Sequence, residues 1–190
     1  MSEAKKSDAR FADSPNVWSA RLWIMMGLAF VSTFLMVRRF TATPATSSKG
    51  GQADYGWVLT DLDGKPAKLS AYAGRPIFLN VWATWCPPCQ EEMPSIARLA
   101  ANPKLAGVAF LCISTEESPD PVKAFVASKK PPMTMLMAGG PAPKVFKTEG
   151  IPATFVIAPN GRIVRAVVGA TEWDQPEVVT MLEELAREAK

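Results

Sequence analysis

Two cysteines three positions apart, Cys86 and Cys89, constrain this chain more than any other feature, because of the segments that flank them. Residues 77–82, just before them, are apolar and rich in β-formers, which predicts a short buried strand. Apolar residues after them recur at helical spacing, so a helix is expected to begin at or near Cys86. The unpaired N–H groups and the positive dipole end of a helix N-terminus favour a thiolate there. Cys89 lies one turn later on the same face, close enough to form a disulfide, so the segment predicts a dithiol redox site.

The main alternative for a CxxC pair is half of a structural zinc site, which needs about four Cys or His ligands. The chain has no histidine and only one further cysteine, Cys112, which lies in an apolar run. The dithiol interpretation is therefore preferred, and no metal ion or other cofactor is expected. The lack of histidine also excludes Ser–His and Cys–His nucleophilic catalysis. We expect Cys112 to be an inert core residue, the alternative being a third redox cysteine.

Residues 1–54 are expected to precede the folded domain and to divide into three segments. Residues 1–21 form an N-terminal tail. Residues 22–37 carry no charge, and as a helix they would span about 24 Å, against the roughly 30 Å of a bilayer core. An uncleaved transmembrane anchor explains this run better than a cleaved signal peptide, because Arg38 and Arg39 follow it directly. Residues 38–54 are expected to be a flexible linker, because residues 41–54 are mostly small, polar and rich in Gly, Ser and Pro.

The basic charge of the chain belongs to this N-terminal part. Residues 1–50 carry seven Lys or Arg against three Asp or Glu, whereas residues 51–190 carry fourteen against fifteen. A near-neutral domain gives no reason to expect a nucleic-acid partner. Four basic residues precede the run 22–37 and three follow it, so their count favours neither orientation in a membrane clearly.

Residues 55–190 are sized for one domain, and their pattern alternates between strands and helices. Asp-Gly at 63–64 and Asn-Gly at 160–161 indicate two hairpins, the alternative for the first being an irregular loop. Thr-Glu-Trp-Asp at 171–174 resembles a capping box and predicts that the last helix opens there. The expected order is strands 57–60 and 67–69, strand 77–82, the CxxC helix, strand 108–113, helix 119–128, strand 133–137, a short helix 142–148, strands 153–157 and 162–167, and a C-terminal helix.

This order of elements, with the CxxC after the central strand, resembles the thioredoxin fold over residues 55–190. Three motifs narrow the resemblance to the membrane-anchored TlpA/ResA group of thiol:disulfide oxidoreductases. They are FLNVWATWCPPC at 78–89, EEMP at 91–94 and GIPATF at 150–155. The resemblance implies an α/β thioredoxin fold with an N-terminal β-hairpin and a helix inserted between its two halves, preceded by one transmembrane helix.

The resemblance also implies a substrate-binding surface around the dithiol. Pro152 corresponds to a cis-proline that faces the CxxC motif, and a cis X–Pro bond is physically plausible there. Ile151, just before it, would offer backbone groups that pair with an extended substrate segment, as in β-augmentation. Trp85, just before the CxxC motif, and Pro87 and Pro88 within it are also expected to contact the substrate.

One polar position near the dithiol departs from thioredoxin. Thioredoxin has a buried aspartate six residues before its first cysteine, and this chain has Asn80 there, which cannot take up a proton. Glu92, three residues after Cys89, matches an acidic residue that the TlpA/ResA group has near its dithiol. We therefore expect Glu92 to relay protons to and from Cys89. The alternative is a solvated helix glutamate with no such role.

The function that the resemblance implies is reduction of protein disulfides on the periplasmic side of the cytoplasmic membrane. The expected substrates are disulfides in an apocytochrome c or in a copper-centre protein, and the expected electron donor is a membrane thiol transporter. A dithiol oxidase of the same fold is the nearest alternative. A thiol peroxidase and a copper chaperone that uses both cysteines and the methionines are more distant ones.

Overall fold

The computed structural model describes residues 51–189. The predicted tail 1–21, the predicted anchor 22–37 and all but the last residues of the predicted linker 38–54 lie outside this part. Among residues 51–189 there is no helix with the length and apolar character needed to cross a bilayer. The last residues of the predicted linker pair with a distant loop: Ala53 N donates to Gly161 O at 2.8 Å, and Gln52 forms an isolated bridge with Arg162.

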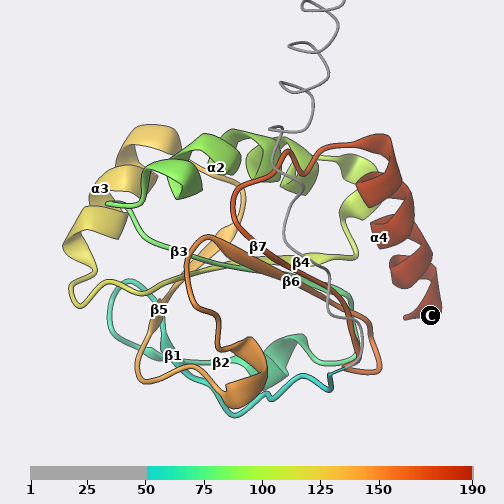
Figure 1. The fold of residues 1–190 in the computed structure, drawn as a ribbon, viewed down its shortest axis with the longest axis horizontal. Coiled ribbons are helices and arrows are strands. Elements are labelled where there is room, and N and C mark those ends of the chain that lie inside the picture. Colours follow the sequence, from blue (N-terminus) through green and yellow to red (C-terminus); the bar gives the residue numbers. More distant parts are fainter. Residues whose placement is uncertain (1–50, 190) are drawn as a thin grey trace, which may run out of the picture. The chain divides into compact units, whose positions relative to one another are not determined.

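Seven strands form one mixed sheet in the order β2-β1-β5-β4-β3-β6-β7 (Figure 1). Strands β3, β4 and β5 run parallel, whereas the pairs β1–β2, β1–β5, β3–β6 and β6–β7 are antiparallel. The central strand β3 coincides with the predicted strand 77–82, and every residue in it is buried. The strands are β1 Val58–Thr60, β2 Pro66–Lys68, β3 Ile77–Trp82, β4 Ala109–Ser114, β5 Thr134–Ala138, β6 Ala153–Ile157 and β7 Ile163–Val168.

Both predicted hairpins are confirmed, and their turns have the geometry that the sequence signals require. Gly64 and Gly161 adopt φ values of +80° and +85°, in the left-handed region that suits glycine. In the first turn, Asp61 Oδ1 accepts hydrogen bonds from the amides of Asp63 and Lys65, both at 2.9 Å. These local interactions stabilise the turn that joins β1 to β2.

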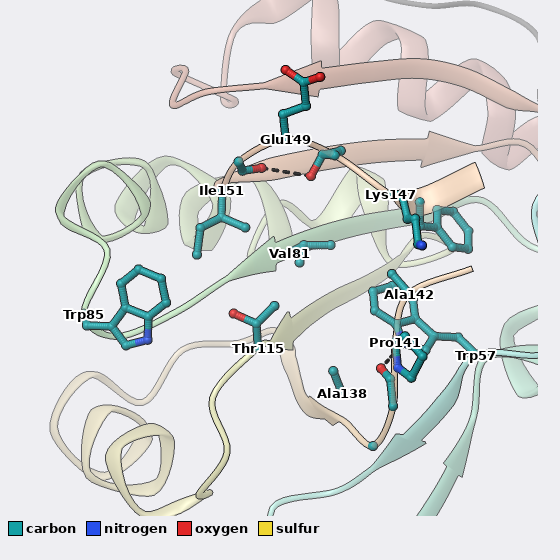
Figure 2. A pocket seen from close by; sticks show the side chains of 15 residues that line it. Trp57, Val81, Trp85, Thr115, Ala138, Pro141, Ala142, Lys147, Glu149 and Ile151 are labelled. Carbon is teal, nitrogen blue, oxygen red and sulfur yellow. Dashed lines mark hydrogen bonds between the residues drawn. The ribbon is translucent and has the colours of Figure 1, made fainter. Parts of the chain in front are cut away.

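In the part of the chain that the structure describes, the helical segments over one face of the sheet are short 3₁₀ turns, namely η1 Leu69–Tyr72 and η3 Lys144–Phe146. Leu79 and Val81 of β3 belong to the core cluster on this face, together with Trp57 and Phe146. The cover is incomplete, and Val81 lies at the base of an open cavity there (Figure 2).

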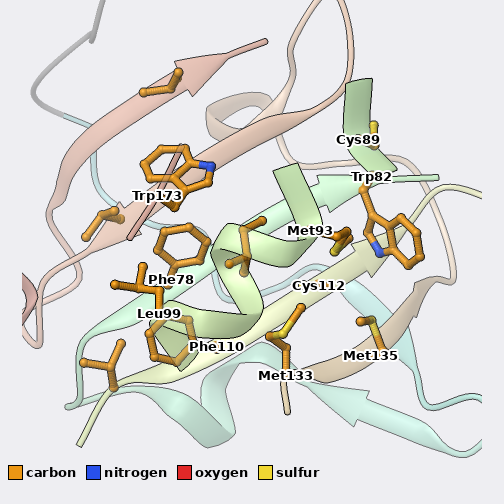
Figure 3. Packing of buried hydrophobic residues seen from close by; sticks show 14 of the residues in the cluster. Phe78, Trp82, Cys89, Met93, Leu99, Phe110, Cys112, Met133, Met135 and Trp173 are labelled. Atoms are coloured by element: carbon orange, nitrogen blue, oxygen red, sulfur yellow. The ribbon is translucent and has the colours of Figure 1, made fainter. Parts of the chain in front are cut away.

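The three long helices lie together on the other face: α2 Pro87–Ala100, α3 Asp120–Lys129 and α4 Pro176–Glu188 (Figure 1). Phe78 and Trp82 of β3 point into this layer (Figure 3). Phe78 meets the edge of the Trp173 ring with centroids 5.0 Å apart, and Trp82 packs on Phe125 of α3 at 4.9 Å. Helix α2, which carries the two cysteines, is thereby packed against the central strand.

Two predictions near the C-terminal half are wrong. The short helix predicted at 142–148 is only the 3₁₀ turn η3, because Pro141, Pro143 and Gly150 interrupt a helical backbone around it. The last helix does not open at 171–174. Helix α4 begins at Pro176 after Gln175, with no side-chain cap, because the preceding segment is irregular and is tied to α2 by tertiary contacts described below.

Candidate active site

Cys86 and Cys89 are joined by a disulfide at the start of α2, with their Cα atoms 5.2 Å apart. Cys86 is the N-cap residue, as the sequence predicts, and Cys89 lies in the first turn. The two sulfurs differ in access, because Cys86 is 4% exposed and Cys89 is fully buried. Only the Cys86 sulfur can therefore be reached first by a disulfide of another protein.

The two prolines between the cysteines decide which helix amides face the Cys86 sulfur. Pro87 and Pro88 occupy the first two helical positions, where a missing N–H costs the helix no hydrogen bond. The amide of Cys89 is therefore the first N–H of the helix, and it points at Cys86 Sγ from 3.2 Å. A Cys86 thiolate is stabilised by this single hydrogen bond and by the helix dipole.

The peptide bond between Ile151 and Pro152 is cis, and the structure brings this segment next to the dithiol. Cys86 Sγ lies 3.8 Å from the carbonyl oxygen of Ile151. Pro152 is held in turn by its own carbonyl, which accepts from Gly169 N at 2.8 Å. Trp85, beside the reactive sulfur, is 67% exposed. The sulfur, a backbone carbonyl and a large exposed aromatic ring thus share one surface.

Glu92 is buried, at 2% exposure, although it is a charged residue on the helix that begins at the dithiol. Its Oε1 accepts from Asn80 Nδ2 at 2.7 Å. Its Oε2 accepts from the indole N–H of Trp173 at 3.1 Å and from the amide of Thr171 at 3.3 Å. The carboxyl group is therefore fixed one helical turn from Cys89, with a specific partner on each oxygen.

Burial raises the pKa of Glu92 to about 7, although the hydrogen bonds from Trp173, Asn80 and Thr171 act in the opposite direction. A group with such a pKa exchanges protons readily near neutral pH. A hollow of about 230 Å³ lined by Glu91, Glu92 and Thr171 connects this position to solvent. The solvated-glutamate alternative is thus wrong for Glu92, since its side chain is enclosed.

Asn80 is suited to both protonation states of Glu92. In the observed orientation, Asn80 Nδ2 donates to Glu92 and also to Thr154 Oγ1 at 2.9 Å. Within residues 51–189, nothing donates to Asn80 Oδ1. A half-turn of the amide would place Oδ1 against Glu92, where it could accept a hydrogen bond from the protonated carboxyl group.

A model of the Redoxin family matches residues 40–182. This chain belongs to the Redoxin family. The thiol-disulfide oxidoreductase ResA of Bacillus thuringiensis (strain Al Hakam) is 31% identical over 160 residues, which cover 83% of this chain and 91% of that protein. ResA of Bacillus subtilis (strain 168) is 30% identical over 154 residues, covering 78% of this chain and 86% of that one. The crystal structure of a thiol:disulfide interchange protein from Chlorobium tepidum TLS is 25% identical, with a TM-score of 0.54, covering 75% and 98%.

These relatives and the CxxC disulfide identify the chain as a thiol:disulfide oxidoreductase with a thioredoxin-like α/β fold. Its third cysteine, Cys112, is unpaired and fully buried in β4. Burial strongly raises the pKa of the Cys112 thiol, and the charge of nearby Glu92 adds to the effect. Its reactive thiolate form is therefore suppressed, as expected of an inert core cysteine.

Glu116 stabilises the turn between β3 and α2, but sequence reasoning did not predict it as a site residue. Glu116 Oε1 accepts from the amide of Thr84 at 3.0 Å and also from its hydroxyl, and Oε2 accepts from Ser114 Oγ at 2.6 Å. From the other side, the Gln90 side chain of α2 donates to Thr84 O. No sequence motif marks Glu116, because its contact with the turn exists only once β3 and β4 pair.

Trp173 was also missed as a site residue. It is fully buried, its amide donates to Ser95 Oγ of α2 at 3.1 Å, and its indole donates to Glu92. The guanidinium of Arg165 lies 5.2 Å from its ring centroid. The signal was present, since a tryptophan within a polar segment between two elements often indicates a buried anchor.

Proposed function

We propose that this oxidoreductase reduces disulfides of other proteins, and that it does so on the periplasmic side of the cytoplasmic membrane while anchored by residues 22–37. The observation that carries the reductase proposal is the position of Cys86, the less buried of the two cysteines, beside the Ile151 carbonyl. The anchor rests on the sequence alone: sixteen uncharged residues bracketed by arginines, followed by a linker long enough to separate the domain from the bilayer.

In the proposed reaction, the Cys86 thiolate attacks one sulfur of a substrate disulfide. The Cys86–substrate bond forms as the substrate S–S bond breaks, and the first substrate thiolate leaves. Cys89 then attacks Cys86 Sγ, which forms the Cys86–Cys89 disulfide and releases the second substrate thiolate. The substrate gains two electrons and the enzyme loses two.

Glu92 has a defined part in the second step. Cys89 is a buried thiol, and it must lose its proton before it can attack Cys86. We assign Glu92 as the acceptor of that proton, because its carboxyl group is enclosed one turn away and has a pKa of about 7. The hollow beside Glu91 and Thr171 lets the proton pass to solvent. This assignment rests on the position and pKa of Glu92, because Asn80 cannot take up a proton.

The oxidised enzyme needs two electrons from another dithiol before it can act again. In an oxidising compartment we propose a membrane thiol transporter as the donor, and an apocytochrome c or a copper-centre protein as the acceptor. Both acceptor classes contain paired cysteines that bind their cofactor only when reduced.

The test of the catalytic assignment is reduction of insulin disulfides with dithiothreitol as the electron source. Cys86→Ser should abolish it, because no thiolate remains at the accessible position. Cys89→Ser should instead accumulate a mixed disulfide on Cys86, and Cys112→Ala should retain full activity. Full activity in Cys86→Ser would contradict the proposal.

The reduction potential separates a reductase from the dithiol oxidase alternative. A Cys86–Cys89 midpoint near the roughly −270 mV of thioredoxin supports a reductase, whereas one near about −120 mV supports an oxidase. For the anchor, the full chain should sediment with membranes and resist extraction by high salt. Deletion of residues 22–37 should release it.

A further inference from the structure

The cavity that has Val81 at its base lies on the side of the sheet away from the three helices and extends to the surface beside the dithiol (Figure 2). We refer to it below as the hollow. Its volume is about 670 Å³, within the range of roughly 300–1,000 Å³ found for ligand sites. At one end it is lined by Trp85 and Ile151, the two residues that flank the Cys86 sulfur. At the other end it reaches Trp57 and Phe146. The hollow is thus continuous with the surface on which a substrate disulfide must lie.

The far end of this hollow has a fixed aromatic wall. Trp57 and Phe146 stack with centroids 5.7 Å apart and an interplanar angle of 21°, and Phe155 meets Phe146 edge-on at 5.1 Å. The Trp57 indole N–H is satisfied by Gly140 O at 3.3 Å. Because the rings are held by one another and by this hydrogen bond, the wall is preorganised and needs no polar partner from a ligand.

The hollow is open because the stretch of chain along its edge has only small side chains or none. Residues 138–142, Ala-Gly-Gly-Pro-Ala, run along its edge between β5 and η3. A Cβ at Gly139 would come within 3.2 Å of Val58, whereas a Cβ at Gly140 would meet nothing closer than 4.0 Å. Two charged residues of opposite sign, Lys147 and Glu149, line the hollow and are exposed. With one charge of each sign, they give the hollow no net charge that would select a charged occupant.

We propose that this hollow is a subsite for a large apolar side chain, preferably aromatic, that neighbours the attacked cysteine in the substrate polypeptide. The proposal rests on the proposed reductase function and specifies its substrate. An extended segment held at Ile151 places its neighbouring residues about 3.3 Å apart, so one of them lies over the hollow when the cysteine sulfur meets Cys86. Trp57 and Phe146 are themselves largely buried, so an aromatic side chain there would contact the part of each ring that lines the hollow and gain a favourable ring–ring interaction.

The test uses the full chain and a set of disulfide-linked peptides. Each peptide carries one cysteine and a phenylalanine one or two positions before or after it, and a matched peptide carries serine at all four positions. At one or more positions, phenylalanine should lower KM about tenfold relative to serine, the discrimination that an apolar pocket typically supplies. Equal KM values for all five peptides would overturn the inference.

A variant that fills the hollow should remove this preference. Ala142→Phe should raise KM for the preferred peptide about tenfold, to the value of the serine peptide, with kcat and the Cys86–Cys89 midpoint unchanged. Gly140→Leu, at a position with free space around its Cβ, should have the same effect if Ala142→Phe does not fold. Ala106→Phe is the matched control, because Ala106 is exposed in the turn before β4, and it should retain the full preference.

The remaining outcomes are also informative. If the peptide preference survives both filled variants, the hollow is not the subsite and the inference is wrong. If the variants instead impair reduction of oxidised glutathione and of all the peptides equally, the hollow does not discriminate the residue beside the attacked cysteine and the inference is again wrong. Failure of the wild-type chain to reduce any peptide disulfide would contradict the proposed function itself, which distinguishes the two.

Discussion

At the scale of single residues, Glu92 combines three properties that a surface glutamate lacks: a specific donor on each oxygen, nearly complete burial and a pKa of about 7. If it accepts the Cys89 proton, the rate at which Cys89 resolves the mixed disulfide should rise as pH passes through about 7. Glu92→Gln removes the acceptor, so this rise should disappear and the rate at pH 8 should fall about 100-fold. Stopped-flow measurement of substrate release across pH 5 to 9 records both effects.

The control for this experiment is the neighbouring residue. Glu91 lies on the same helix turn and is exposed, so Glu91→Gln should retain both the inflection and the rate. An inflection near pH 7 that persists in Glu92→Gln would show that another group accepts the proton. Asn80→Asp is a complementary change, because it places a second carboxyl group against Glu92 and should shift the inflection to higher pH through like-charge repulsion.

At the scale of elements, the turn between β3 and α2 is fixed from both sides, by Glu116 after β4 and by Gln90 of α2. Glu116→Ala leaves the Thr84 amide and hydroxyl without their acceptor, so Trp85 and Cys86 should be less well positioned. We expect kcat/KM for protein disulfides to fall about tenfold, and the free energy of unfolding to fall by about 1–3 kcal/mol. Insulin reduction and urea unfolding measure the two effects.

Two further variants distinguish positioning from a general loss of stability. Glu116→Gln keeps an oxygen that can accept both hydrogen bonds from Thr84, so it should restore most of kcat/KM. Glu117→Ala, at the exposed neighbouring position, should change neither quantity. If Glu116→Gln is as impaired as Glu116→Ala, the hydrogen bonds to Thr84 do not position the turn.

The elements also show what the sequence could and could not predict. Strand β3, helix α2 and the two hairpins were predictable, because apolar periodicity and turns such as Asn160-Gly161 are encoded within a few residues. The start of α4 was not. Its apparent capping box contains Trp173, which contacts Phe78 and Glu92 far away in sequence, and these contacts outweigh the local capping preference.

The same distinction applies to the site. Cys86 and Cys89 lie in a motif of contiguous residues, so they could be located from the sequence, and the family resemblance implied the cis bond before Pro152. The enclosure of Glu92 depends on residues from β3, α2 and the segment before α4. The hollow depends on how small residues near 138–142 lie against the N-terminal hairpin. Neither arrangement follows from local periodicity, because each is created by packing between distant segments.

At the scale of the whole molecule, Glu92 should set the pH dependence of stability between pH 4.5 and about 7. Its pKa is raised from 4.5 to about 7 on folding, so in this range the folded state binds a proton that the unfolded state has lost. The contribution of Glu92 to the free energy of unfolding is therefore fully present below pH 4.5. It falls by about 3 kcal/mol as the pH rises to about 7. The lowered pKa of Asp174, caused mainly by its hydrogen bond from Arg98, acts below this range.

Urea unfolding of the disulfide form at a series of pH values tests this expectation, because neither active-site cysteine titrates in that form. The midpoint should fall from pH 4.5 to 7 in the wild type and in Glu91→Gln, and it should stay nearly constant in Glu92→Gln. A wild-type midpoint that stays constant over this range would mean that Glu92 is ionised throughout in the folded state, and would contradict the expectation. The same buried carboxyl group that we assign to proton transfer thus lowers stability at neutral pH, as is common for functional groups held in an apolar setting.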